Sequence, residues 1–170
     1  MPITKPVADF AWREAANYQV SERTVTKTGE NSWDASVMSK HPLSGVGVVE
    51  FSVLLTKTTY SHIMIGVSPP YLNQTKKNNY TDGPGYYYYC GNGKLYSKQA
   101  NKQCADYPGG RPLKSGEEVG VSVDFTNQTI SFIVAGENKG VAYDFTSGTE
   151  LYPVVMFANA GDSVALIKIT

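Results

Sequence analysis

The stretch from Val119 to Tyr143 constrains the fold most, because it alternates apolar and polar residues between clusters of turn residues. Its first part, VGVSVDF, has the period of a strand with one buried face. Thr129–Val134 is β-branched and aromatic, as strands prefer. Asp124–Gln128 and Ala135–Asn138 have the composition of tight turns. The pattern predicts a three-stranded meander whose apolar face needs a second sheet.

Similar short apolar segments recur along the rest of the chain, and none shows a sustained 3.6-residue period. We expect further strands over Val20–Thr28, Trp33–Met38, Val46–Lys57, Tyr60–Val67, Tyr86–Cys90, Lys94–Ser97, Leu151–Ala158 and Asp162–Ile169. We expect Val46–Lys57 to pair with Tyr60–Val67, and the last two segments to pair with each other. Asp9–Tyr18 fits a helical turn or a strand, and Tyr71–Gly85 and Lys98–Lys114 read as long loops. The fold class predicted is all-β, a two-sheet antiparallel β-sandwich.

Length and charge restrict the function classes. A chain of 170 residues is expected to form one domain, residues 1–170, with a core of its own. Its 15 basic and 15 acidic residues balance, which gives no support for a nucleic-acid or membrane partner. No apolar run follows Met1, so we expect neither a secretory signal nor a membrane span. These features predict a cytoplasmic monomer.

The two cysteines, Cys90 and Cys104, lack the spacing of a metal or redox motif. A disulfide between them and a pair of free thiols both fit the sequence. The expected cytoplasmic location favours free thiols.

Residues for catalysis are sparse. His41 and His62 are the only histidines and do not form a metal-binding motif. Glu50 and Asp124 stand alone in their predicted strands, and Asp124 is better suited to capping the turn that follows it. We therefore expect a protein that is not an enzyme and has no metal and no cofactor.

Several segments, in order, resemble one known family. VSVDF, ISFIVAGENKGVAY and LYPVVMFANAGDSVAL are similar to the C-terminal half of a SPRY domain, and GVVEF, IGV and GNGKLY are similar to its earlier strands and turn. The resemblance is strongest over residues 33–169. It implies a sandwich of the concanavalin A or jelly-roll type, with SPRY-like connections and a ligand surface made by loops. It also implies a protein–protein interaction module or adaptor that binds a peptide or protein and recruits it to a larger assembly.

The resemblance also suggests where a ligand binds. In SPRY proteins of the SOCS-box type, the peptide contacts an early Arg-Pro loop, a tyrosine after the I-G-V strand, and a Val-Trp pair after L-Y-P-V-V. Tyr80 matches the tyrosine, Ala158-Asn159 takes the place of the Val-Trp pair, and the Arg-Pro pair has no counterpart. These departures argue against the Asn-rich peptide specificity of that type. The predicted binding residues are Tyr80, Asn159, Tyr71, Asn73, Tyr86 and Ala158.

A second function class stays open at this stage. Tyrosine-rich sheet faces and Asn-rich loops also suit a lectin-like sandwich that binds glycans, since rings stack on sugars and amides bond to hydroxyls. The absence of a clustered Asp/Asn calcium motif argues against that alternative.

Overall fold

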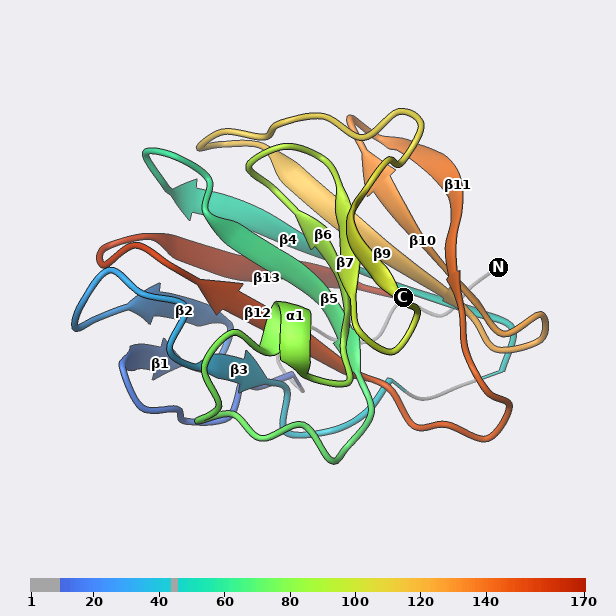
Figure 1. Cartoon of the computed structure of the whole chain (residues 1–170), viewed down its shortest axis with the longest axis horizontal. Helices are drawn as coiled ribbons and strands as arrows, with labels where there is room; N and C mark the ends of the chain where they lie inside the picture. Colours follow the sequence, from blue (N-terminus) through green and yellow to red (C-terminus); the bar gives the residue numbers. More distant parts are fainter. Residues whose placement is uncertain (1–9, 44–45) are drawn as a thin grey trace.

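Antiparallel strands form the framework of the protein. The structure, a computed structural model, describes residues 10–43 and 46–170. In these residues two antiparallel sheets pack face to face, and a single helical turn, α1 (Asn79–Asp82), lies in front of the smaller sheet (Figure 1). The predicted all-β sandwich is confirmed.

The larger sheet carries the predicted meander at one end. Within the described residues its spatial order is β1 (Tyr18–Ser21), β2 (Thr24–Lys27), β13 (Ser163–Ile169), β4 (Val48–Lys57), β9 (Glu118–Asp124), β10 (Thr129–Val134) and β11 (Glu137–Asp144). Asp124 caps the turn after β9, where its carboxylate accepts hydrogen bonds from the backbone N–H groups of Thr126 and Asn127. Ala135 and Gly136 both have positive φ, as the two-residue turn from β10 to β11 requires.

The smaller sheet supplies the second layer. Across the described residues its order is β3 (Ser36–Met38), β12 (Tyr152–Phe157), β5 (Ile63–Ser68), β6 (Tyr86–Tyr89), β7 (Leu95–Ser97) and β8 (Lys102–Ala105). Every residue of β5 is buried, because one face meets the larger sheet and the other lies under the segment that contains α1. This double burial explains why the segment is a continuous apolar run in the sequence.

Aromatic rings fill the space between the sheets. The ring of Phe132 in β10 lies 5.4 Å from that of Tyr88 in β6, and 6.0 Å and 6.2 Å from those of Tyr107 and Tyr143. The hydroxyl of Tyr143 donates to the backbone oxygen of Tyr87, which satisfies the polar end of a buried ring. The ring of Tyr143 thus contributes apolar area to the core without leaving its hydroxyl group unpaired.

The core agrees with the sequence pattern. Six apolar residues of the predicted strands are fully enclosed, and Phe125 is half-buried against the ring of Phe145. The six enclosed residues are Val121, Val123, Ile130, Phe132, Val154 and Phe157.

Two predicted strand pairings are wrong. β4 pairs with β9 and β13, whereas β5 pairs with β6 and β12 in the other sheet. The last two strands, β12 and β13, likewise belong to different sheets. In both places the connection crosses from one sheet to the other, and local periodicity carries no information about that step.

The predicted strand bounds also need correction in short segments. Val20–Thr28 is a hairpin of two strands, β1 and β2, with Val20 opposite Val25. The predicted loop Lys98–Lys114 contains β8, and the loop Tyr71–Gly85 contains α1. Between Phe10 and Asn17 the chain is irregular except for a bridge from Trp12 to Ser39.

Candidate functional site

Six aromatic side chains form a continuous, partly exposed band on the outer face of the smaller sheet. We call this group the aromatic band, and its members are Trp33, Tyr60, His62, Tyr80, Tyr89 and Tyr96. Each ring contacts at least one other ring of the band, with centroids 5.0–6.2 Å apart. None of the six is fully buried, so the band is part of the surface.

The pleat of β6 and β7 orients two of these rings. Successive side chains of a strand point to opposite faces, so Tyr86 and Tyr88 face the core while Tyr87 and Tyr89 face outward. Tyr87 pairs with Tyr96 across the sheet, which puts Tyr96 on the outer face as well. The outward tyrosines rest on a cluster formed by Met38, Met64, Leu72, Tyr87, Val154 and Met156.

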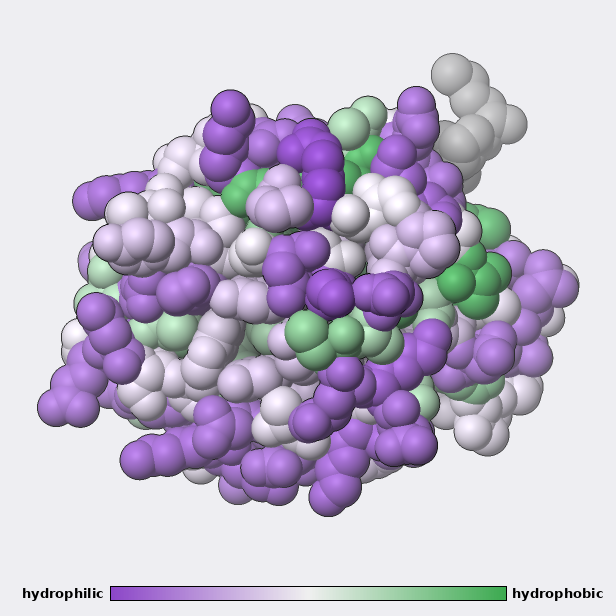
Figure 2. Space-filling view, turned by 45° about the horizontal axis from the view of Figure 1, so that its top comes forward, coloured by the Kyte–Doolittle hydropathy of each residue, from purple (hydrophilic) through white to green (hydrophobic). Residues whose placement is uncertain are grey.

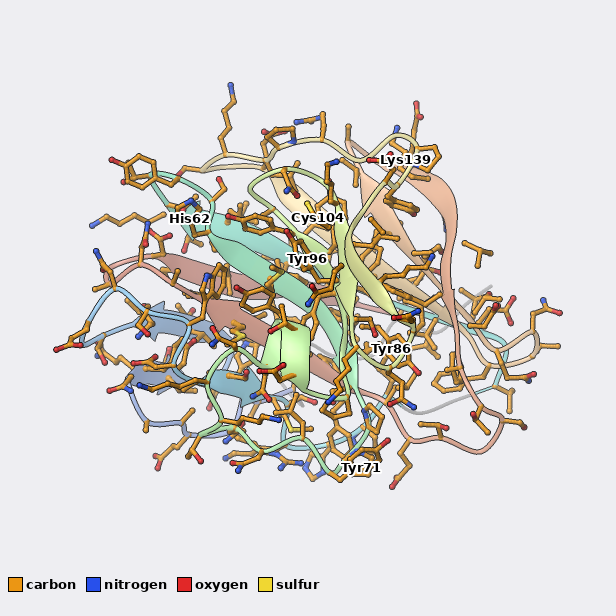
Figure 3. All side chains as sticks on the ribbon, in the orientation of Figure 1. His62, Tyr71, Tyr86, Tyr96, Cys104 and Lys139 are labelled. Atoms are coloured by element: carbon orange, nitrogen blue, oxygen red, sulfur yellow. The ribbon has the colours of Figure 1, made fainter. Side chains whose placement is uncertain are left out.

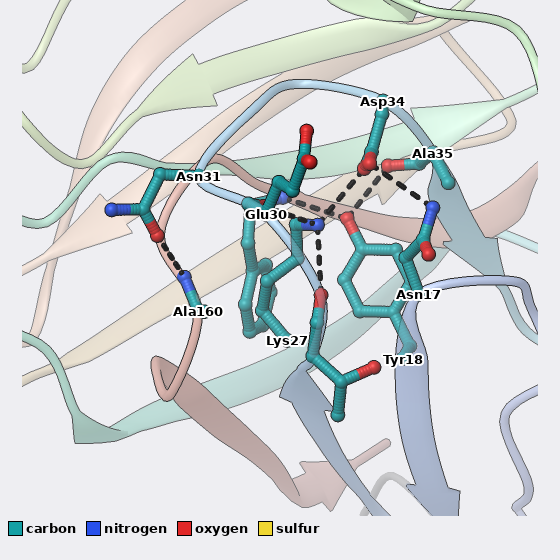
Figure 4. A network of polar contacts seen from close by, with 10 residues as sticks. Asn17, Tyr18, Lys27, Glu30, Asn31, Asp34, Ala35 and Ala160 are labelled. Carbon is teal, nitrogen blue, oxygen red and sulfur yellow. Dashed lines mark hydrogen bonds and ion pairs between the residues drawn. The ribbon is translucent and has the colours of Figure 1, made fainter.

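A buried ion pair positions the loop that bears Trp33. The ammonium group of Lys27, which has no exposed side-chain surface, donates to Asp34 Oδ1 at 2.9 Å and to the backbone oxygens of Thr28 and Glu30 at 3.1 Å (Figure 4). The side-chain oxygen of Asn31 accepts a hydrogen bond of 2.8 Å from the backbone N–H of Ala160. The loop is therefore held on both sides of Trp33.

Polar contacts fix α1 and the ring of Tyr80 in a similar way. Asn79 is buried, and its amide nitrogen donates to Ser36 Oγ at 3.0 Å and to the backbone oxygen of Asn73 at 2.8 Å. The backbone N–H of Asn78 donates to the backbone oxygen of Trp33 at 2.8 Å. The segment carrying Tyr80 is thus joined to both β3 and the Trp33 loop.

The hydroxyl groups of Tyr80, Tyr89 and Tyr96 stay protonated around neutral pH, because the pKa of each is raised. Partial burial raises the pKa of Tyr80, with a further contribution from Asp82, and burial also raises the pKa of Tyr89. Burial together with the neighbouring Cys104 thiol raises the pKa of Tyr96 to about 12. These tyrosines therefore present neutral O–H groups that can donate hydrogen bonds to a ligand.

Three of the residues predicted for binding lie in or beside the aromatic band. Tyr80 belongs to it. Ala158, at the end of β12, donates its backbone N–H to the backbone oxygen of His62 at 3.0 Å. Asn159 follows in the partly exposed turn before β13. The structure therefore brings Tyr80 and the Ala158-Asn159 turn to the same aromatic surface, at different members of the band.

The other three predicted residues lie elsewhere. Tyr71 is 68% exposed and lies at the lower edge of the view in Figure 3, away from His62 and Tyr96. The Asn73 carboxamide oxygen accepts bonds from Thr75 N–H and Oγ1–H, which stabilises a turn. Tyr86 is only 4% exposed and packs in the core against the ring of Tyr143, so we omit it from the candidate surface.

Sequence reasoning did not single out Trp33, Tyr60, His62, Tyr89 and Tyr96 as site residues. The run YYYY over residues 86–89 shows that two tyrosines share each face of the strand, but it does not show which pair faces out. A better signal is the spacing of the tyrosines around the turn at GNG. Tyr87 and Tyr89 are two residues apart and share one face of the strand, and a hairpin at GNG places Tyr96 on that same face.

The surroundings of the band offer little else for chemistry. In the described part of the chain no group of three or more His, Cys, Asp or Glu side chains could hold a metal ion. No helix there is long and apolar enough to cross a membrane. The face shown in Figure 2 is mostly hydrophilic, with pale areas of intermediate hydropathy and small hydrophobic patches rather than one large apolar area.

Fold and site together define an antiparallel sandwich domain that displays a loop-framed aromatic surface. The model of the SPRY domain family matches residues 48–168. The chain therefore belongs to the SPRY domain family, whose members are protein-interaction modules.

Solved structures agree on the fold. The SPRY domain of human HERC1 superposes with a TM-score of 0.67 at 20% identity, over 91% of this chain and 96% of that one. Another human SPRY domain gives 0.66 at 20% identity, over 92% and 96%. The TRIM65 PSpry domain gives 0.63 at 15% identity, over 96% and 90%. No curated protein sequence matched the chain.

Proposed function

We propose that this SPRY domain is a non-catalytic recognition module that holds a segment of a partner protein against the aromatic band. Tyr80 and Asn159 are the proposed primary contacts, and the Val25–Ser36 segment forms one wall through Trp33. Tyrosine is a rigid anchor that combines an apolar ring with a polar hydroxyl group. Asparagine can both donate hydrogen bonds to a peptide backbone and accept them from it.

The observation that carries this proposal is the continuity of the band across four separate chain segments that are tied together. Trp33, His62, Tyr80 and Tyr89 come from different parts of the sequence, yet the hydrogen bonds described above connect their loops. Rings that are already in place lose little conformational freedom when a ligand binds. A rigid sandwich that presents such loops is a common design for recognition.

The cellular setting is part of the same proposal. Both cysteines of the described structure are free, Cys90 in the core and Cys104 at the surface. Free thiols are typical of a reducing compartment, so we propose that the domain works in the cytoplasm, as a monomer that recruits its partner to a larger assembly.

A peptide-display selection against the immobilised protein tests the proposal. Selected peptides are then measured by calorimetry against the wild type, Tyr80→Ala and Asn159→Ala. We expect Tyr80→Ala to weaken binding by about 2 kcal/mol or more, since anchor rings dominate interface energies. Tyr71→Ala is the matched control, because this exposed tyrosine lies away from the band.

The outcomes separate the possibilities. Equal affinity for the wild type and for both band variants would move the site to another surface, with the Lys98–Lys114 segment as the next candidate. A glycan array run on the same sample addresses the lectin alternative, which would be favoured by glycan binding that Tyr80→Ala abolishes.

A further inference from the structure

The aromatic band consists of ring side chains, and this composition restricts what can bind to it. No Lys, Arg, Asp or Glu belongs to the band. Among residues 10–43 and 46–170, the indole N–H of Trp33 and the hydroxyls of Tyr80 and Tyr89 have no hydrogen-bond partner in the protein. The band therefore offers ring faces and unpaired N–H and O–H donors, and its hydroxyl oxygens can also accept hydrogen bonds.

The backbone beneath the band is not available to a ligand. β6 lies between β5 and β7, and β7 lies between β6 and β8, so the N–H and C=O groups of both strands are engaged within the sheet. A peptide cannot extend the sheet here, because strand addition needs an open edge. Over β6 and β7 a ligand must therefore bond to side chains rather than to the backbone of the strands.

We propose that the ligand is a proline-rich segment in the polyproline II conformation; this rests on the proposed function and names the class of peptide. Proline has no backbone N–H, so such a segment presents carbonyl oxygens that need donors and leaves no donor of its own unsatisfied. Its rings pack on aromatic faces, and its preformed helix loses little entropy on binding. Each of these properties complements the band.

The dimensions of the band suit such a segment. From Tyr60 through His62, Tyr89 and Tyr96 to Tyr80, consecutive ring centroids are 5.5–6.2 Å apart. A polyproline II helix rises about 3.1 Å per residue, so neighbouring rings are spaced by about two residues and the four intervals of the band accommodate at most about eight residues.

Trp33 provides a direct readout. The chain has two tryptophans, and Trp12 is 1% exposed in the core while Trp33 is part of the band. The probe is a capped octaproline peptide, titrated into the full chain while tryptophan emission and the ¹H–¹⁵N spectrum are followed. We expect a saturable change in Trp33 emission and shifts of amide signals from β6, β7 and α1.

Matched peptides and variants make the result specific. A capped alanine-based peptide of the same length and charge should bind at least tenfold more weakly. Tyr89→Phe keeps the ring and removes the hydroxyl, so we expect affinity for octaproline to fall about three- to tenfold, the effect of one hydrogen bond. Tyr71→Ala should leave affinity unchanged. The ¹H–¹⁵N spectrum of each variant verifies that it is folded.

Failure of this inference can be told from failure of the proposed function. If octaproline does not bind, or the alanine peptide binds equally well, the inference is wrong. If display then selects proline-free peptides whose binding Tyr80→Ala weakens, the proposed function stands without it. If neither peptide class binds the band and an oligosaccharide shifts the Trp33 signal, both are wrong.

Discussion

The ammonium group of Lys27 lies 2.9 Å from a carboxylate oxygen of Asp34, with the lysine side chain fully enclosed and the aspartate side chain 15% exposed. Lys27→Met would leave Asp34 and the backbone oxygens of Thr28 and Glu30 without this donor. We expect the free energy of unfolding to fall by about 3–5 kcal/mol, the range for breaking one side of a buried pair. Urea unfolding followed by circular dichroism measures it.

The double variant Lys27→Met with Asp34→Leu is the control for that experiment. Removing both charges leaves no buried ion unpaired, so the double variant should be more stable than Lys27→Met alone. A double variant that is less stable than the single one would show that the pair is not what holds the loop.

Phe132 is the most connected ring of the core, in contact with Tyr88, Tyr107 and Tyr143. Phe132→Ala should lower the free energy of unfolding by about 3–5 kcal/mol, because it removes buried apolar area and leaves a cavity. Val141→Ala is the comparison, since Val141 is 63% exposed on β11 and should change stability by less than about 0.5 kcal/mol. A cost below about 1 kcal/mol for Phe132→Ala would contradict the described core.

The two thiols should react very differently with a thiol reagent. Cys104 is exposed, whereas Cys90 is enclosed and its pKa is raised by burial. Because the thiolate is the reactive form, the native protein should give one fast-reacting thiol per chain and the unfolded protein two. Mass spectrometry of the labelled chain should place the native label on Cys104, and labelling of both at one rate would refute the expectation.

Alkaline pH should destabilise the fold through its buried tyrosines. Burial raises the pKa of Tyr18 and of Tyr143 far above the ordinary value of 10. The unfolded chain thus releases these protons first, so their stabilising contribution is complete below pH 10 and is lost as the pH rises above it. Urea unfolding at neutral pH and above pH 10, with tyrosinate absorbance as a second signal, measures the loss. Constant stability across that interval would rule out this coupling.

Local patterns in the sequence predicted the meander and β4, because the apolar residues of β4 and β9 recur with a clear period of two. The pairing of β4 with β9 and β13 depends on connections that cross between the sheets, and no local pattern encodes these. β8 was missed because its four residues, Lys102–Ala105, are half-buried or exposed and show no apolar face.

The candidate site was predictable in part. Similarity to the SPRY family pointed to Tyr80 and the Ala158-Asn159 turn, which lie in or beside the aromatic band. The same similarity pointed to the Val25–Ser36 segment as a wall of the site but did not single out Trp33, since the position of this ring depends on the buried Lys27–Asp34 pair, and charged residues are usually expected at the surface. To find Tyr89 and Tyr96, one must know which face of β6 points outward, and a run of four tyrosines does not show this.

Two of the hydrogen bonds that hold the band together use main-chain atoms at both ends: Asn78 N–H to the Trp33 oxygen, and Ala158 N–H to the His62 oxygen. Such bonds do not depend on which side chain each residue carries. Point substitutions at Trp33 or His62 would therefore change the side chains that the surface presents while the loops keep their course. This separation of framework from surface side chains makes the band a practical starting point for engineering new binders.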